Sequence, residues 1–175
     1  ARAGPGTGGG ALMTGLTIRP ATIADADAIW AMVEPVIRSG ETYALDRGLG
    51  RNAGVAVWLA SDRHTFIAQE PGGPVGCYFL KANQPGGGAH VANCGYVTAS
   101  PATGRGVARA MCAHSLDVAR TLGFAAMQFN FVVTSNTRAV ALWESMGFAI
   151  VGRLPGAFVH PRLGEVDVLV MYRRL

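Results

Sequence analysis

The most constraining feature of this chain is a stretch in which an extended segment turns through two glycines into a helical pattern. Residues 97–113 read VTASPATGRGVARAMCA. An apolar helical face follows the glycines, made of Val107, Met111, Val118 and Leu122. The first N–H groups of a helix lack partners, and the helix dipole adds positive charge there. Since Gly104 and Gly106 present no Cβ to a ligand, the stretch predicts a phosphate site or an ordinary strand-to-helix turn.

The spacing around these glycines matches neither of the common phosphate-binding motifs. Position 109 is Arg, which excludes the pattern G-x-G-x-x-G, and no Gly-Lys-Ser/Thr follows as in a P-loop. Arg105 and Arg109 nevertheless add fixed positive charge beside the turn.

Two segments together carry a resemblance to a known family. Residues 103–108, TGRGVA, fit the pattern Arg/Gln-x-x-Gly-x-Gly/Ala except that Thr103 stands first. Residues 136–148, NTRAVALWESMGF, fit Asn-x-x-Ala-x-x-Leu-Tyr/Trp followed by Gly-Phe. The chain thus resembles the GCN5-related N-acetyltransferases (GNAT family) over about residues 16–175.

The resemblance implies acetyl-CoA as cosubstrate and no metal. Pantetheine would lie in a gap between the fourth and fifth strands, and the pyrophosphate would be bound by N–H groups between Gly104 and Arg109. The residues that it assigns to acetyl-CoA are Val97, Ala99, Thr103, Gly104, Arg105, Gly106, Val107, Ala108, Arg109, Asn136 and Trp143.

Two of these residues have an alternative interpretation. Trp143 stands where the family often has a tyrosine that protonates the departing thiolate. Indole is not a practical acid, so either Trp143 packs the cofactor while solvent protonates the thiolate, or another residue acts. Trp143 is equally consistent with a core residue, and Asn136 with a helix N-cap.

Glu41 and Asn130 are the candidate catalytic residues. Glu41 follows the first predicted helix, where the family places acceptor-binding residues, and a carboxylate there can hold or deprotonate an ammonium group. Asn130 alternates with Met127, Phe129 and Phe131, so we expect those three in the core and Asn130 on the opposite sheet face. Further candidates for the base are His90, Asn93, Cys94, His160 and Asp167.

The acceptor is only broadly indicated. Residues 128–136 resemble a branch that includes fungal enzymes acetylating toxic proline analogues. We therefore expect acetyl transfer to the primary or secondary amine of a small, amino-acid-like acceptor. The alternatives are a protein or peptide N-acetyltransferase and a CoA-sensing or partner-binding module without turnover. The sequence is also compatible with a homodimer.

Periodicity and turn residues predict the element order β-α-α-β-β-β-α-β-α-β-β. Expected strands are 16–19, 65–70, 74–82, 89–99, 127–131, 148–153 and 165–173, and the helices begin near 25, 55, 107 and 137. Thr22-x-x-Asp25 is a capping-box pattern. Periodicity indicates an α/β or α+β fold with a mostly antiparallel first half. The resemblance implies a mixed sheet of about seven strands with helices on both faces.

Composition narrows the class of protein. Of the 175 residues, 50% are hydrophobic and 15% charged, which excludes a disordered class. The net charge of +4 suits an anionic ligand, but no basic run with aromatics indicates nucleic acid. Three cysteines without C-x-x-C predict neither disulfides nor zinc. We expect a leader at 1–13, one domain at 14–175, a cytoplasmic location and no membrane contact.

Overall fold

The computed structural model describes residues 15–175, so the predicted leader at 1–13 lies outside the described residues. The strands are β1 (Thr17–Pro20), β2 (His64–Glu70), β3 (Gly73–Ala82), β4 (Val91–Thr98), β5 (Ala126–Val133), β6 (Ala149–His160) and β7 (Gly164–Arg174). The helices are α1 (Ala26–Ser39), α2 (Arg51–Leu59), α3 (Val107–Thr121) and α4 (Thr137–Ser145). This order confirms the one predicted from the sequence.

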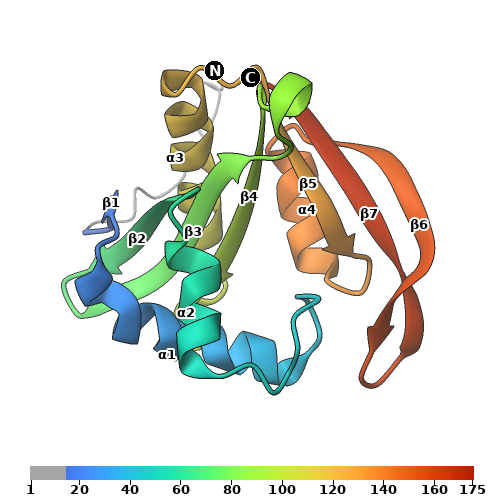
Figure 1. The fold of residues 1–175 in the computed structure, drawn as a ribbon. Helices are drawn as coiled ribbons and strands as arrows, with labels where there is room; N and C mark the ends of the chain where they lie inside the picture. The colour runs from blue at the N-terminus through green and yellow to red at the C-terminus, as the bar shows by residue number, and fades with distance from the viewer. Residues whose placement is uncertain (1–14) are drawn as a thin grey trace, which may run out of the picture.

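All seven strands form one mixed sheet in the order β1-β2-β3-β4-β5-β7-β6. Every neighbouring pair is antiparallel except β4 and β5, which run parallel. That parallel pairing is confined to Val91 with Ala126 and Ala92 with Met127. Beyond it the two strands diverge, and Figure 1 shows the sheet opening between them.

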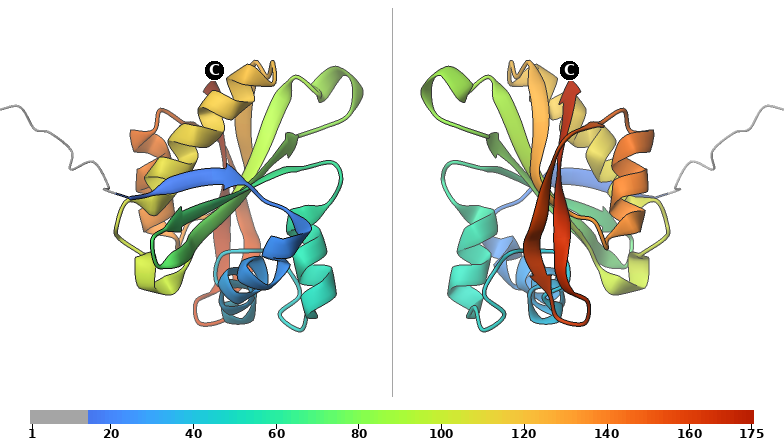
Figure 2. Two further views of the ribbon diagram at one scale, coloured as in Figure 1. Left: turned by 90° about the vertical axis from the view of Figure 1, so that its left-hand side faces the viewer. Right: turned by 90° about the vertical axis from the view of Figure 1, so that its right-hand side faces the viewer.

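Helices cover both faces of the sheet, as expected. Helices α3 and α4 pack on one face and α1 and α2 on the other (Figure 2). Met111 of α3 and Trp143 of α4 belong to one buried cluster, while Ile29 of α1 and Trp58 of α2 belong to a second. No helix in residues 15–175 has both the length and the apolarity that crossing a bilayer requires.

The start of the first helical segment is fixed by the predicted capping residues. The Thr22 N–H donates to the Asp25 carboxylate at 2.7 Å. Arg19 on β1 also donates to this carboxylate, and its hydrogen bond is the main cause that lowers the pKa of Asp25 to about 2. The chain then buries Ile29 and Ile37 along α1, which places the loop after α1 beside the gap in the sheet.

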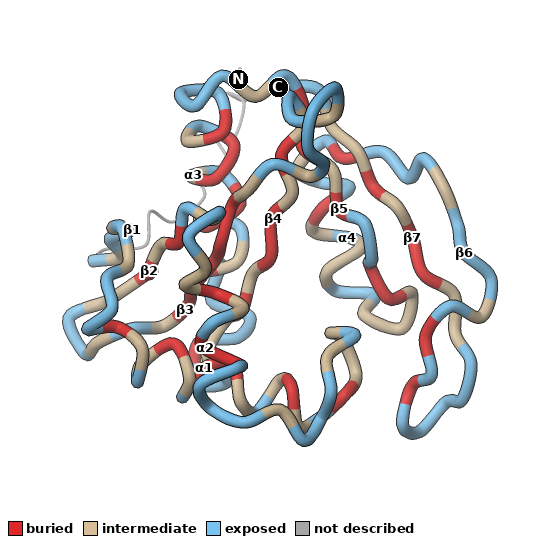
Figure 3. The backbone as a smooth tube through the Cα atoms, viewed as in Figure 1, coloured by how far each residue is buried: buried red, intermediate tan, exposed pale blue. Residues whose placement is uncertain are grey.

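Three expectations are wrong in detail. Phe131 is 37% exposed because a register irregularity between Phe129 and Val132 turns the end of β5, so Val132 is buried in its place. Leu122 is 44% exposed because it follows the last turn of α3. Strand β6 continues past residue 153 to His160, because it resumes pairing with β7 after an irregularity. Figure 3 shows the burial of β3 and β4 and the exposure of much of β6.

Candidate active site

The backbone of β4 presents hydrogen-bonding groups to the gap. Alternate residues of a strand direct these groups to the same side. The Ala99 N–H donates to Val75 on the β3 side, whereas the His90 carbonyl accepts from Ala125 on the β5 side. Even-numbered residues of β4 therefore face the gap. The backbone groups of Val97 and Ala99, the expected cofactor contacts, face β3, although Val97 also lines the cavity described below. The backbone groups that border the gap are those of Tyr96 and Thr98.

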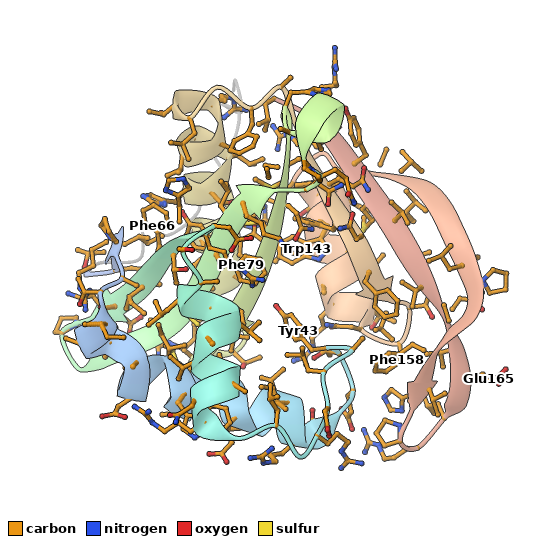
Figure 4. All side chains as sticks on the ribbon, in the orientation of Figure 1. Tyr43, Phe66, Phe79, Trp143, Phe158 and Glu165 are labelled. Carbon is orange, nitrogen blue, oxygen red and sulfur yellow. The ribbon has the colours of Figure 1, made fainter. Side chains whose placement is uncertain are left out.

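A cavity of about 440 Å³ occupies the region where β4 and β5 diverge. Its aromatic lining comes from Tyr43, Phe79, Tyr96, Phe129, Phe131 and Trp143. Its polar lining comes from Thr42, Asn93, Cys94, Thr98, Asn130 and Asn136. Figure 4 shows three of these side chains, Tyr43, Phe79 and Trp143, converging from the loop after α1, from β3 and from α4.

The cavity wall carries no charge. Within the part of the chain that the structure describes, its lining includes no Asp, Glu, His, Lys or Arg. Its titratable groups are Tyr43, Cys94 and Tyr96, and burial raises the pKa of each. Nor do residues 15–175 gather three His, Cys, Asp or Glu side chains that could bind a metal ion.

A glycine in β4 allows the aromatic lining to approach the strand closely. A Cβ at Gly95 would lie 2.6 Å from the Phe79 ring and 3.2 Å from the Tyr43 hydroxyl. Without that Cβ, Tyr43 donates a hydrogen bond to the Tyr96 carbonyl at 2.9 Å. The loop after α1 is thereby attached to the edge of β4 that borders the cavity.

The predicted glycine turn follows β4 directly. Gly104 has φ of 80° and Gly106 has φ of 86°, a left-handed conformation that glycine adopts without strain. A Cβ at Gly104 would meet nothing within 4 Å, so the turn is open on its outer side. In the described residues, no backbone carbonyl accepts from the N–H groups of Val107, Ala108 and Arg109 at the start of α3.

Both arginines at the turn already have partners. Arg105 pairs with Glu70 at 2.6 Å, at the end of β2. Arg109 donates to the Ser145 hydroxyl at 2.8 Å, at the end of α4. An anion at this turn would therefore be bound mainly by free backbone N–H groups, with Arg105 and Arg109 on either side.

Asn136 and Trp143 have the structural roles that the sequence left open. The Asn136 side chain accepts from the Ala139 N–H at 3.3 Å, which makes it the N-cap of α4. Trp143 is 8% exposed, and its ring centroid lies 5.0 Å from those of Tyr96 and Phe129. Both residues also line the cavity, so neither structural role excludes contact with a ligand.

Asn130 lines the cavity within a row of amides. Its nitrogen donates to the Asn83 oxygen at 2.6 Å, and its oxygen accepts from Gln128 at 2.8 Å. An amide has two N–H groups and two lone pairs, so Asn130 keeps one donor and one acceptor for a ligand. The Asn93 side chain donates to the Gln128 carbonyl at 2.9 Å and so bridges the two strands at the start of the gap.

Glu41 lies next to the lining but is not part of it. Its carboxylate pairs with Arg162, in the turn between β6 and β7, at 2.7 Å. Two other base candidates are also outside the lining: His160 is 5% exposed at the end of β6, and Asp167 pairs with Arg153 at 2.7 Å. The Gly156 N–H is the main cause that lowers the pKa of Asp167.

Sequence reasoning missed the contributions of Tyr43, Phe79 and Gly95. Tyr43 stood two residues after Glu41 in the loop that the resemblance linked to acceptors. Two features of the sequence could have indicated Tyr43: its position in this loop, and the tryptophan at position 143, where the family often has a tyrosine. The packing of Phe79 against Gly95 joins separate strands, so neither local periodicity nor a motif could have indicated it.

The comparisons with known proteins agree with this geometry. The model of the acetyltransferase (GNAT) family matches residues 30–148, which is more than half of the chain. The chain belongs to the GNAT family.

Individual relatives support the assignment. The chain is 29% identical to N-acetyltransferase aca1 of Schizosaccharomyces pombe over 137 residues, covering 69% of this chain and 66%, just under two thirds, of the yeast protein. A GCN5-related N-acetyltransferase from Kribbella flavida is 41% identical and superimposes with a TM-score of 0.88, over 92% of this chain and 98% of that one. The Salmonella typhimurium protein yncA, solved with its cofactor acetyl-CoA, is 21% identical with a TM-score of 0.81, over 93% and 95% of the chains, and shares the fold.

Proposed function

We propose that this GNAT protein is an acetyl-CoA-dependent N-acetyltransferase that acetylates the primary or secondary amine of a small, amino-acid-like acceptor. The observation that carries the proposal is the cavity between β4 and β5, which has gap-facing backbone groups on one wall and the glycine turn at the end of that wall. A long thioester with a phosphate-bearing end fits this combination of a polar strand edge and a helix start.

The acetyl-CoA site follows from these parts. The pantetheine arm pairs with the gap-facing backbone of Tyr96 and Thr98. The pyrophosphate lies against the open side of Gly104 and Gly106 and accepts from the N–H groups of residues 107–109. Of the side chains assigned from the resemblance, those of Thr103, Arg105 and Arg109 lie around the turn, and Asn136 and Trp143 line the cavity.

The chemistry proceeds by direct transfer. An amine attacks the thioester carbon only as the free base, so its ammonium form must first lose a proton. Because the wall is uncharged, desolvation favours the neutral amine. The carbonyl oxygen gains negative charge during the attack, and gap-facing N–H groups of β4 are suited to stabilise it.

The acceptor site lies on the side of the cavity formed by the loop after α1 and by β5. Asn130 offers a free donor and a free acceptor to a polar group of the acceptor. Glu41 lies beside this site and, through Arg162, holds the loop against the turn between β6 and β7. We therefore place Glu41 at the mouth of the site and Asn130 within it.

Two alternatives remain to be distinguished. The solved relatives include a protein described as a putative phosphinothricin N-acetyltransferase and the ribosomal-protein-alanine N-acetyltransferase of Brucella melitensis, at 21% and 24% identity. These likenesses concern the fold alone. The aromatic, uncharged cavity supports a small acceptor over a protein chain. A CoA-binding module without turnover would need no acceptor site.

An acceptor panel tests the proposal. Thiol release from acetyl-CoA is measured with pooled amino acids, pooled small amines and peptides that have free N-termini or lysines. We expect release with one of the small-molecule pools. Release with peptides alone would contradict the proposed acceptor class, and binding of acetyl-CoA without release in any pool would favour the non-catalytic module.

A further inference from the structure

The departing CoA thiolate needs a proton, and the tryptophan at position 143 cannot supply it. Three side chains that line the cavity carry an O–H or S–H group able to ionise: Tyr43, Cys94 and Tyr96. Their environments differ, and this difference identifies the donor.

Two of the three groups are directed into the core on the α3 side of the sheet. The Tyr96 hydroxyl lies 2.7 Å from the Ser115 hydroxyl and 3.7 Å from the Met127 sulfur. Ser115 and Met127 are fully buried, so this phenol ends in the core beneath α3. Cys94 belongs to the same buried cluster.

Tyr43 approaches from the other face of the sheet. Its hydroxyl donates to the Tyr96 carbonyl at 2.9 Å, and that carbonyl belongs to the strand edge bordering the gap. The open space at Gly95 permits this approach. Trp58 packs against the Tyr43 ring at a centroid distance of 6.1 Å, which steadies the phenol at the edge of β4.

We propose, on the basis of the acetyl transfer proposed above, that Tyr43 is the proton donor to the CoA thiolate. A hydroxyl hydrogen rotates about its C–O bond, so it can leave the Tyr96 carbonyl for a sulfur that develops charge beside it. The phenol stays protonated until then, because burial keeps it neutral.

The step balances without a further reactant. The amine lone pair forms the C–N bond to the acetyl carbon, and the C–S bond breaks with its electron pair going to sulfur. Sulfur takes the hydroxyl proton of Tyr43. The resulting phenolate takes the proton that the new amide nitrogen must lose, so the products are the amide, the free thiol and neutral Tyr43.

The first test compares two phenylalanine variants that each remove one hydrogen-bonded hydroxyl. Tyr43→Phe removes the proposed donor. Tyr78→Phe removes the buried hydroxyl that lies 2.6 Å from His114 Nδ1, outside the cavity lining. We expect Tyr43→Phe to lower kcat roughly a hundredfold, as loss of a general acid does, with unchanged acetyl-CoA affinity by calorimetry. Tyr78→Phe should leave kcat within about threefold.

A second readout separates proton donation from mere positioning. Polyfluorinated tyrosine at position 43 keeps the hydroxyl but ionises at lower pH. Since an acid is lost as pH rises through its pKa, kcat of this variant should fall at alkaline pH where the wild type does not. If kcat of Tyr43→Phe stays within about threefold, or the fluorinated variant shows the wild-type pH profile, the assignment is overturned. A wild type without turnover on any acceptor would overturn the proposed function itself.

Discussion

The Glu41 carboxylate and the Arg162 guanidinium lie 2.7 Å apart and join the loop after α1 to the turn between β6 and β7. The next two residues of that loop, Thr42 and Tyr43, line the cavity. The pair is partly exposed, and such pairs contribute about 0–1 kcal/mol to stability. In our proposal, this ion pair holds the mouth of the acceptor site closed while still allowing it to open.

Glu41→Gln should accordingly change the acceptor KM by a few-fold. It should leave the alkaline rise of the pH–rate profile intact, because the amine loses its proton before it enters the uncharged cavity. Steady-state kinetics against pH checks this. Arg162→Gln is the matched control, since it breaks the same ion pair but keeps the carboxylate. If Glu41→Gln alone flattened the alkaline rise, Glu41 would be the general base.

Gly104→Ala should weaken acetyl-CoA binding. The new Cβ would occupy the open side of the turn, where the pyrophosphate lies in our proposal, and a left-handed alanine costs about 1–2 kcal/mol. Gly123→Ala is the control, because Gly123 also has positive φ and open space but follows the far end of α3. Both variants should lose similar stability in denaturant titrations. Equal acetyl-CoA affinity of the two by calorimetry would contradict the phosphate site.

Asn130→Ala should affect the acceptor and spare the cofactor. Loss of one hydrogen bond to a charged group costs about 1.5–3 kcal/mol, or roughly ten- to a hundredfold in kcat/KM for the acceptor. Gln128→Ala is the control, because Gln128 touches Asn130 but does not line the cavity. We expect a smaller loss there. A loss of acetyl-CoA affinity alone in Asn130→Ala would move Asn130 to the cofactor site.

Trp143→Phe should keep most of the turnover. Trp143 packs between Tyr96 and Phe129, so its replacement should cost about 0.5–3 kcal/mol of stability. Thermal unfolding and kcat are measured on the same preparation. A loss of kcat above roughly a hundredfold in a folded variant is the size expected for a general acid and would show that Trp143 takes part in the chemistry.

The sequence predicted local features well where one element contains all of the signal. Periodicity and backbone restrictions act over a few residues. They therefore predicted the buried stripe of Ile29 and Ile37, the capping pair Thr22 and Asp25, and the glycine turn. The family motifs then implied the sheet topology, which periodicity did not determine.

Features that depend on pairing between distant segments could not be predicted from the sequence. Whether Val97 or Tyr96 faces the gap depends on the register of β4 with β3, and a shift of one residue reverses the direction of every backbone group. The exposure of Phe131 depends on an irregularity in the pairing of β5 with β7. The ion pair between Glu41 and Arg162 joins segments far apart in sequence. No local sequence signal could therefore have predicted that the Glu41 carboxylate is paired.

Acetyl transfer from acetyl-CoA to an amine produces free thiol and N-acetylated amine in equal amounts, so product stoichiometry distinguishes it from thioester hydrolysis and from binding alone. Wild-type protein is incubated with acetyl-CoA and the acceptor found in the panel, and free thiol and N-acetylated product are quantified together by mass spectrometry. We expect equal amounts of the two, both dependent on protein and acceptor. Thiol without acetylated amine, or no thiol despite bound acetyl-CoA, would contradict it.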